Sequence, residues 1–356
     1  MVLALGLPLS HAERPFTVAG GPVASTPTSA VPADAGEAAR AAVASHFAPT
    51  IYQETKDQRD LIAAMDFDGD WDLTNNASHV DGRPMPAVVY DTVVETPTHW
   101  FLTYLPYHPV DAKGVNGHDN DTEHATMVVR KDGSAFGRLE AMEVRFHDWM
   151  YQYAAPGSGV GDAADDVDGP IHFDTDGRPM INAQRVGHGL CGGLAPTLPF
   201  FDSLALRCRH RDTPRIARQG VVYRYKGRAE APRSLDDRDV GYALVEIGEQ
   251  VWPRARDAGA LRVFATRMDF RGERCTEYDC PRGIGAVLAS AVGHGSTGMP
   301  WEEGPGKGVS KAGDPFFDPA YTLGRRLRFP APFAIDYSFN PYLGVGSFPD
   351  TALAAH

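Results

Sequence analysis

The segment Gly117-His118-Asp119-Asn120-Asp121-Thr122-Glu123-His124 leads directly into the apolar run Ala125-Thr126-Met127-Val128-Val129-Arg130, and together they indicate the fold to expect around them. Two imidazoles and three carboxylates fall within the seven residues 118–124. The apolar run has the length and the β-branched content of a buried strand. We therefore expect a core strand that follows immediately after a cluster of side chains able to bind a metal ion.

Alternating and β-branched runs elsewhere predict further strands, separated by turn-forming residues as in antiparallel sheets. They occupy residues 87–96, 99–108, 139–146, 220–225 and 242–247. The sequence Lys131-Asp132-Gly133-Ser134 is typical of a hairpin turn. The fold class we expect is mainly β, an antiparallel β-sandwich with long loops and a few short helices.

Helical signals are few. An N-capping Asp34 followed by several alanines predicts a short helix that ends before Pro49. The clearest later candidate is the segment from Ile284 to Val292. Gly-rich residues 156–182 and the Gly-, Pro- and aromatic-rich tail 299–342 predict long loops that cover the core.

Composition limits the class of protein. The chain has 356 residues, 43% of them hydrophobic, which is enough for a sizeable core. Residues 1–35 combine an apolar start, similar to the end of a secretory signal peptide, with a flexible Pro-rich lead-in, and we expect one β-sandwich domain over residues 36–356. The net charge of −12 disfavours nucleic acid as a partner. No run approaches the ~20 apolar residues of a transmembrane segment.

The four cysteines favour an oxidising compartment. Cys275 and Cys280 lie close together, and Cys191 and Cys208 bracket a Gly/Pro-rich loop, so sequential pairing is expected, although four cysteines allow three connectivities. Buried thiols with a reduced pair are the alternative. With the signal-like start, these cysteines predict a secreted or periplasmic protein.

The opening segment also predicts a divalent-metal site. Side chains two or three residues apart in a strand or tight turn can converge on one ion, which makes His118, Asp121 and Glu123 candidate ligands. Asp111 precedes them and can return to the site across a turn. A carboxylate majority suits Mg, Ca or Mn better than Zn.

A second acidic segment, Asp66-Phe67-Asp68-Gly69-Asp70-Trp71-Asp72, has carboxylates at every second position around a glycine. Oxygen-rich loops of this kind wrap calcium, and a second Ca held by Asp66, Asp68 and Asp70 is one interpretation. The spacing departs from that of an EF-hand loop. A solvated acidic turn is the other interpretation, and the sequence leaves both open.

The spacing Gly117-His118-x-x-Asp121-x-Glu123 resembles the Gly-His-Arg-His-Asp-Trp-Glu heptapeptide of the necrosis- and ethylene-inducing peptide-like proteins. With His124 included, it is also similar to the Asn-His-Val-Gly-Asp-Trp-Glu-His element of a vacuolar protein-sorting-associated family. Over residues 47–190 the chain resembles an uncharacterised family of secreted bacterial proteins. That resemblance rests on Asp-Gly-Asp-Trp at 68–71, Val-Val-Glu-Thr-Pro-Thr-His-Trp-Phe at 93–101, the box at 118–123 and Gly-His-Gly at 187–189.

The resemblance to the necrosis-inducing family implies a β-sandwich with one divalent cation on His118, Asp121, Glu123 and an upstream aspartate, for which Asp111 is the candidate. The family's second histidine and its tryptophan are replaced here by asparagine and threonine. Only a small part of the chain shares the pattern, so activity against host membranes is not carried over.

Three histidines are candidates for acid/base catalysis. His188 stands between two glycines, which remove bulk on both sides and suit an imidazole that a ligand can reach, although a turn histidine is the alternative. We expect that replacing it with alanine would leave folding intact. His124 and His108 lie in and near the metal motif. No serine elbow, phosphate loop or dinucleotide fingerprint is present.

Three functions are compatible with this pattern. The first is a secreted metal-dependent hydrolase or lyase with histidine acid/base catalysis. The second is a non-enzymatic secreted protein that uses the same ion to bind a small molecule, glycan or lipid headgroup, as the cytolytic family suggests. The third is a purely structural metal site.

Overall fold

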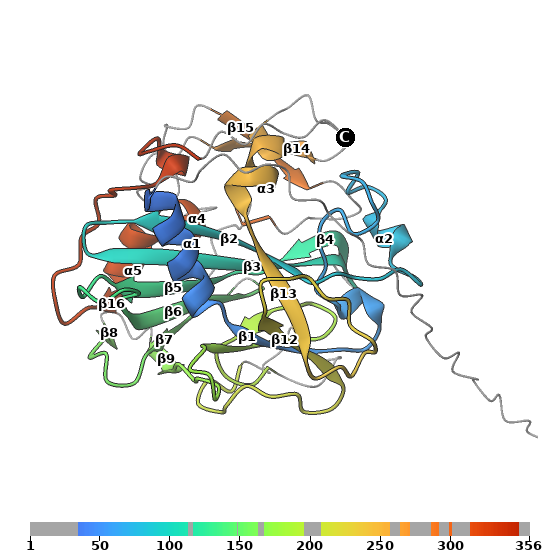
Figure 1. The fold of residues 1–356 in the computed structure, drawn as a ribbon, viewed down its shortest axis with the longest axis horizontal. Helices are drawn as coiled ribbons and strands as arrows, with labels where there is room; N and C mark the ends of the chain where they lie inside the picture. Colours follow the sequence, from blue (N-terminus) through green and yellow to red (C-terminus); the bar gives the residue numbers. More distant parts are fainter. Residues whose placement is uncertain are drawn as a thin grey trace, which may run out of the picture.

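The computed structural model describes residues 35–112, 117–147, 149–162, 167–195, 208–256, 264–270, 286–291, 299–300 and 314–348. Within them the dominant feature is one curled sheet of 12 strands (Figure 1). In spatial order the strands are β11 (Leu190–Cys191), β10 (Met180–Ala183), β1 (Thr50–Glu54), β12 (Gly220–Tyr225), β13 (Val240–Glu246), β2 (Val88–Glu95), β3 (His99–Asp111), β5 (Ala125–Arg130), β6 (Arg138–Phe146), β7 (Trp149–Ala154) and β9 (Val167–Pro170), with β4 (His118–Thr122) paired to the end of β3.

The predicted strands are confirmed, but their predicted arrangement is wrong in part. Four pairs are parallel, namely β1 with β10, β12 with β13, β13 with β2, and β7 with β9, so the sheet is mixed. Hydrophobic alternation reports which face of a strand is buried and carries no information on the direction of its partner. The described strands therefore form a mixed sheet, and an antiparallel sandwich is not confirmed.

Two further strand pairs and several short helices complete the fold. The pairs are β14 (Phe264–Phe270) with β15 (Ala286–Ala291), and β16 (Leu327–Arg328) with β8 (Gly161–Asp162). The helices are α1 (Ala35–Phe47), α2 (Asn76–His79), α3 (Ile247–Arg256), α4 (Asp314–Phe317) and α5 (Pro319–Arg326), with 3₁₀ turns η1 (Gln58–Asp60) and η2 (Pro341–Leu343). No helix in these described ranges has the length and apolar character needed to span a bilayer.

Two helix predictions have opposite outcomes. The N-terminal helix is confirmed as α1, whereas the helix expected over residues 284–292 is wrong, since β15 occupies Ala286–Ala291. A short apolar run does not distinguish a helix from a buried strand, and here pairing with β14 decides. The tail expected as loops contains α4, α5 and η2.

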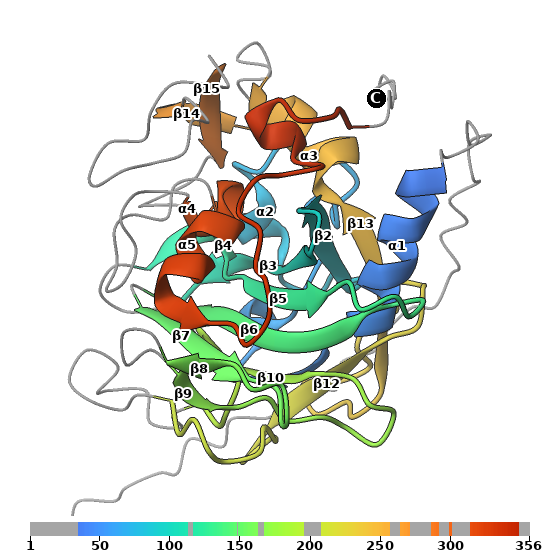
Figure 2. The same cartoon turned by 90° about the vertical axis from the view of Figure 1, so that its left-hand side faces the viewer.

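Helix α1 lies across one face of the sheet (Figures 1 and 2) and is held at its C-terminal end. The Tyr104 hydroxyl donates to the carbonyl of Ala44 at 2.7 Å, and the Tyr242 hydroxyl donates to that of Pro49 at 2.7 Å. Arg178 Nη1 donates to the Ser45 carbonyl at 2.9 Å. Carbonyls at a helix end lack intrahelical partners, so these bonds fix α1 on the sheet.

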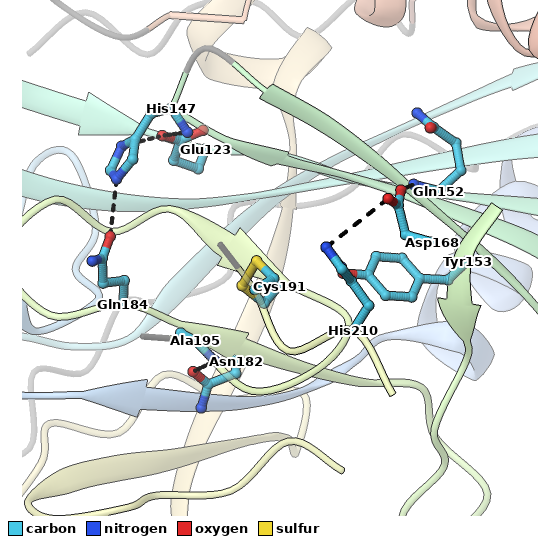
Figure 3. The surroundings of a disulfide bond; sticks show 11 residues. Glu123, His147, Gln152, Tyr153, Asp168, Asn182, Gln184, Cys191, Ala195 and His210 are labelled. Carbon is cyan, nitrogen blue, oxygen red and sulfur yellow. Dashed lines mark hydrogen bonds and ion pairs between the residues drawn. A yellow bond between two sulfur atoms is a disulfide. The ribbon is translucent and has the colours of Figure 1, made fainter. Parts of the chain in front are cut away.

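The disulfide joins Cys191 in β11 to Cys208, with their Cα atoms 5.8 Å apart (Figure 3). This pairing confirms the prediction for these two residues. Cys275 and Cys280 lie outside the described residues.

Two acidic side chains lie side by side under α1. In the strand register Asp91 stands opposite Tyr104 on one side and Glu246 on the other, which places all three on the same face. Asp91 is only 6% exposed, and burial, together with the charge of Glu249, raises its pKa to about 7. Burial and then the charges of Asp91 and Glu249 raise the pKa of Glu246 to about 8. Near neutral pH Glu246 is therefore mostly protonated and Asp91 about half protonated.

Replacing Asp91 with asparagine is expected to stabilise the protein increasingly as the pH rises. The pKa values of both carboxyls are raised in the folded state. Their contribution to stability is therefore complete below about pH 4 and is lost as the pH rises through about 7 for Asp91 and about 8 for Glu246. Over the range pH 5 to 9, the difference in unfolding free energy between Asp91→Asn and wild type should therefore grow by at most about 1.4 kcal/mol per pH unit and level off above about pH 8.

Urea denaturation at a series of pH values measures this difference. The control is Asp176→Asn, the same chemical change in an exposed turn. A difference for Asp91→Asn that stays constant over this pH range contradicts the prediction.

Candidate functional site

The candidate site forms where β3 ends and β4 begins. Asp111 and His118 are cross-strand partners in this antiparallel pair. His118 Nε2 lies 3.9 Å from Asp111 Oδ2 and 3.9 Å from Asp121 Oδ1. The His118 side chain is 13% exposed, whereas both carboxylates are nearly covered. Asp111 therefore lies beside the motif, and one imidazole reaches the surface between two carboxylates.

All four non-glycine residues with positive φ in the described chain lie at this site. They are Asn120 (58°), His147 (55°), Val186 (74°) and His188 (53°). Such conformations cost energy for most side chains and persist where surrounding contacts hold them. Their concentration in one place marks the site more sharply than any sequence motif does.

His188 occupies the interior of the site. Its Nδ1 is 2.8 Å from Asp121 Oδ2, and its Nε2 is 3.4 Å from Asp60 Oδ1. Burial alone would lower the pKa of His188, but its contacts with these two carboxylates raise it to about 9. The imidazole and both carboxylates therefore form a buried ion-paired group.

His108 stacks on His188, with ring centroids 3.8 Å apart and planes 4° from parallel. Its Nε2 lies 3.0 Å from Gln53 Oε1. Burial, followed by the neighbouring positive charge of His188, lowers the pKa of His108 well below the usual value. A neutral ring thus lies against a charged one.

Gly189, next to His188, serves packing rather than access. A Cβ at this position would lie 2.7 Å from Cδ2 of Phe146. The imidazole it was expected to expose is 0% exposed, as are those of His108 and His124. The interpretation of His188 as an open histidine is therefore wrong.

Asp60 was not predicted from the sequence, yet it completes the site. Its Oδ2 accepts the backbone N–H groups of Lys56 at 2.6 Å and Asp57 at 3.2 Å, and its Oδ1 accepts that of Val186. Burial opposes ionisation, but hydrogen bonding with His188 lowers the Asp60 pKa. The capping box Asp57-x-x-Asp60 was a readable signal for the turn η1, but nothing local to it indicates His188.

Glu123 points to a different set of partners from those predicted. Its Oε1 accepts the backbone N–H of His147 at 3.0 Å, and its Oε2 lies 3.6 Å from Arg145 Nε. His147 Nε2 in turn lies 2.9 Å from Gln184 Oε1 (Figure 3). Burial raises the Glu123 pKa. Glu123 therefore contacts the 145–147 corner in this structure, and the charge of Asp121 also acts on its carboxyl.

The segment 66–76 forms a chain of side-chain-capped turns. The backbone N–H groups of Asp70, Asp72 and Thr74 each donate to the aspartate two residues earlier, at 3.3, 2.7 and 3.2 Å. Asp68, with its side chain 1% exposed, also contacts His79 Nδ1 at 2.5 Å. These bonds account for carboxylates at every second position. Calcium on Asp66, Asp68 and Asp70 stays a prediction.

The carboxylates of Asp111 and Asp121 and the imidazole of His118 are groups that commonly bind a divalent cation. Among the described residues, no three His, Cys, Asp or Glu side chains already have the spacing of a metal centre. Donors on one Mg, Ca or Mn ion lie about 3 Å apart. The 3.9 Å separations therefore require Asp111 and Asp121 to move slightly toward His118.

No family model matches this chain, and no characterised protein matches its sequence. Solved structures resemble it in part. One described as a toxin fold for microbial attack and plant defense is 17% identical, over 45% of this chain and 69% of its own, with a TM-score of 0.30. Necrosis and Ethylene inducing Protein 2 from the causal agent of cocoa's witches broom disease is 12% identical, over 57% of this chain and 72% of its own, with a TM-score of 0.28.

A third structure, NLPPya in complex with glucosamine, is 16% identical, over 50% of this chain and 73% of its own, with a TM-score of 0.29. These proteins are of the necrosis-inducing kind that the 117–123 segment resembles. TM-scores at this level are too low to support a functional conclusion, so the function proposed below rests on the site itself.

Replacing His188 with alanine is expected to destabilise the fold by about 3–5 kcal/mol, because the buried carboxylates of Asp60 and Asp121 lose the positively charged imidazole with which both are paired. This reverses the expectation of an intact fold that the sequence suggested. Urea denaturation at neutral pH measures the loss. His46→Ala, at an exposed position, is the control. Equal stability of the His188 variant and wild type contradicts the ion-paired assignment.

Proposed function

We propose that this protein is a secreted binder that uses a divalent cation to hold a ligand rich in hydroxyl groups, namely a glycan or the sugar headgroup of a lipid. The observation that carries the proposal is the contrast between His118 and the histidines behind it. His118 reaches the surface between Asp111 and Asp121, whereas the candidate acid/base histidines have no exposed surface. Carboxylate and imidazole ligands at a surface leave room for ligand oxygens on the same ion.

The alternative is a metal-dependent hydrolase or lyase. That chemistry requires an imidazole or carboxyl within hydrogen-bond reach of the substrate. His188, His108 and His124 are all 0% exposed, and the first two are engaged with Asp60, Asp121 and Gln53. These residues are better suited to hold the site in shape than to transfer protons to a ligand, which is why binding is preferred.

In this proposal each residue has a limited task. Asp111, His118 and Asp121 hold the ion, which is Mg, Ca or Mn rather than Zn, and the ion supplies coordination positions for ligand hydroxyls. His188 fixes the orientation of Asp121 through Oδ2 and leaves its Oδ1 on the side of His118. The Cys191–Cys208 disulfide supports an extracellular or periplasmic location.

The cation assignment predicts that Asp111→Asn and His118→Gln each weaken Mn²⁺ or Ca²⁺ binding at least about tenfold without large loss of stability. Asp121→Ala is expected to abolish binding but also to destabilise the protein, since it leaves His188 without one partner. Isothermal titration of protein purified without chelator, with elemental analysis, measures the affinity.

The matched control is Asp70→Asn in the acidic segment, where the carboxylate caps a turn. Loss of all cation binding in this variant, with normal binding in Asp111→Asn, transfers the site to segment 66–76 and overturns the assignment.

Ligand binding is tested on immobilised oligosaccharides and on vesicles that carry glycolipids, each with and without EDTA. Binding that EDTA leaves unchanged in both arms contradicts cation dependence.

A further inference from the structure

The convergence of His118 and Asp121 is unusual for a β-strand. In a regular strand, successive side chains alternate between faces, so residues three apart point to opposite sides. His118 Nε2 and Asp121 Oδ1 are nevertheless 3.9 Å apart. Between them Asn120 has a φ of 58°, in the left-handed region, and a residue in that conformation interrupts the alternation. The backbone at Asn120 therefore brings the two side chains to one side.

Asparagine is one of the few non-glycine residues that adopt this conformation readily, and here both its amide oxygen and its amide nitrogen are hydrogen-bonded. The Asn120 side chain is 0% exposed and accepts a hydrogen bond from the Tyr107 hydroxyl at 2.6 Å. Its Nδ2 donates to the carbonyl of Leu73 at 3.0 Å. Two directional bonds to separate segments hold the left-handed conformation in place.

The same hydroxyl reaches the acidic segment 66–76. Asn76 Nδ2 donates to the Tyr107 hydroxyl at 2.7 Å and to the carbonyl of Met65 at 2.8 Å. Burial, followed by the charge of Asp68 and those of carboxylates at the site, raises the pKa of Tyr107, so the hydroxyl stays protonated and able to donate to Asn120. The two acidic segments, separate in sequence, thus meet at one buried tyrosine.

We propose that Asn120 is a positioning residue for the cation site and that Tyr107 makes the acidic segment 66–76 a structural part of that site. The inference rests on the proposed cation binding. Asn120 touches neither ion nor ligand and acts by setting the backbone that carries His118 and Asp121. Cation binding then stabilises this backbone, and with it the hydrogen bonds that lead to Leu73 and Asn76.

Two substitutions at one position test the positioning role. Asn120→Gly and Asn120→Ala both remove the amide, so both lose the bonds to Tyr107 and Leu73 and both are expected to lower Tm. Glycine adopts positive φ freely, whereas alanine resists it. We expect the alanine variant to bind Mn²⁺ about 5- to 30-fold more weakly than the glycine variant. A residue with only a structural role would lower Tm in both variants and leave their Mn²⁺ affinities equal.

Tyr107→Phe tests the connection. In the wild type, Mn²⁺ is expected to slow amide hydrogen exchange in segment 66–76, and in Tyr107→Phe this protection should be lost while Mn²⁺ still binds. The exposed-turn variant Asp176→Asn is the control and should keep the protection.

The outcomes separate this inference from the proposed function. No Mn²⁺ or Ca²⁺ binding by the wild type overturns the proposed cation site and the inference with it. Normal wild-type binding with equal affinities in the glycine and alanine variants overturns only the positioning role of Asn120. Full protection of 66–76 in Tyr107→Phe overturns the connection between the two segments.

Discussion

The buried ion pair of His188 with Asp121 and Asp60 is the interaction on which the site depends. It joins β4, the turn η1 and the 184–190 segment, which are far apart in sequence. Removing a charge from water is costly unless an opposite charge and hydrogen bonds replace the solvent. Asp60 meets this condition with backbone N–H groups and the imidazole together. The ion pairs of His188 with Asp60 and Asp121 thus hold the three segments together.

An acidic protein must accommodate its carboxylates, and this one does so in three ways. At the site, Asp60 and Asp121 are both paired with the buried, positively charged imidazole of His188. In the segment 66–76, aspartates accept backbone N–H groups and form the turns themselves. Under α1, Asp91 has Glu246 beside it and burial favours the protonated form of both. The same residue type therefore has a different role in each environment, and the environment is set by tertiary structure.

Local patterns in the sequence predicted the strands, α1 and the Cys191–Cys208 pairing, because each depends on residues near one another or on a simple alternation. They also suggested Asp111 as a neighbour of the motif, and the two residues are cross-strand partners. The parallel strand pairs and Asp60 were beyond reach, because they depend on contacts between distant segments. Asp121 and His188 are 67 residues apart, and no periodicity relates them.

Where the sequence misled, a real signal had a different physical cause. The glycine beside His188 suggested access for a ligand, but it allows Phe146 to pack against the backbone. For the alternating aspartates the sequence left calcium binding and a solvated turn open; turn capping accounts for their spacing, and calcium binding there stays a prediction. Asn120 is one of the two positions at which the chain departs from the similar heptapeptide, and the sequence assigned it no role. In the structure its left-handed backbone brings His118 and Asp121 together, so the departure is part of how this site is built.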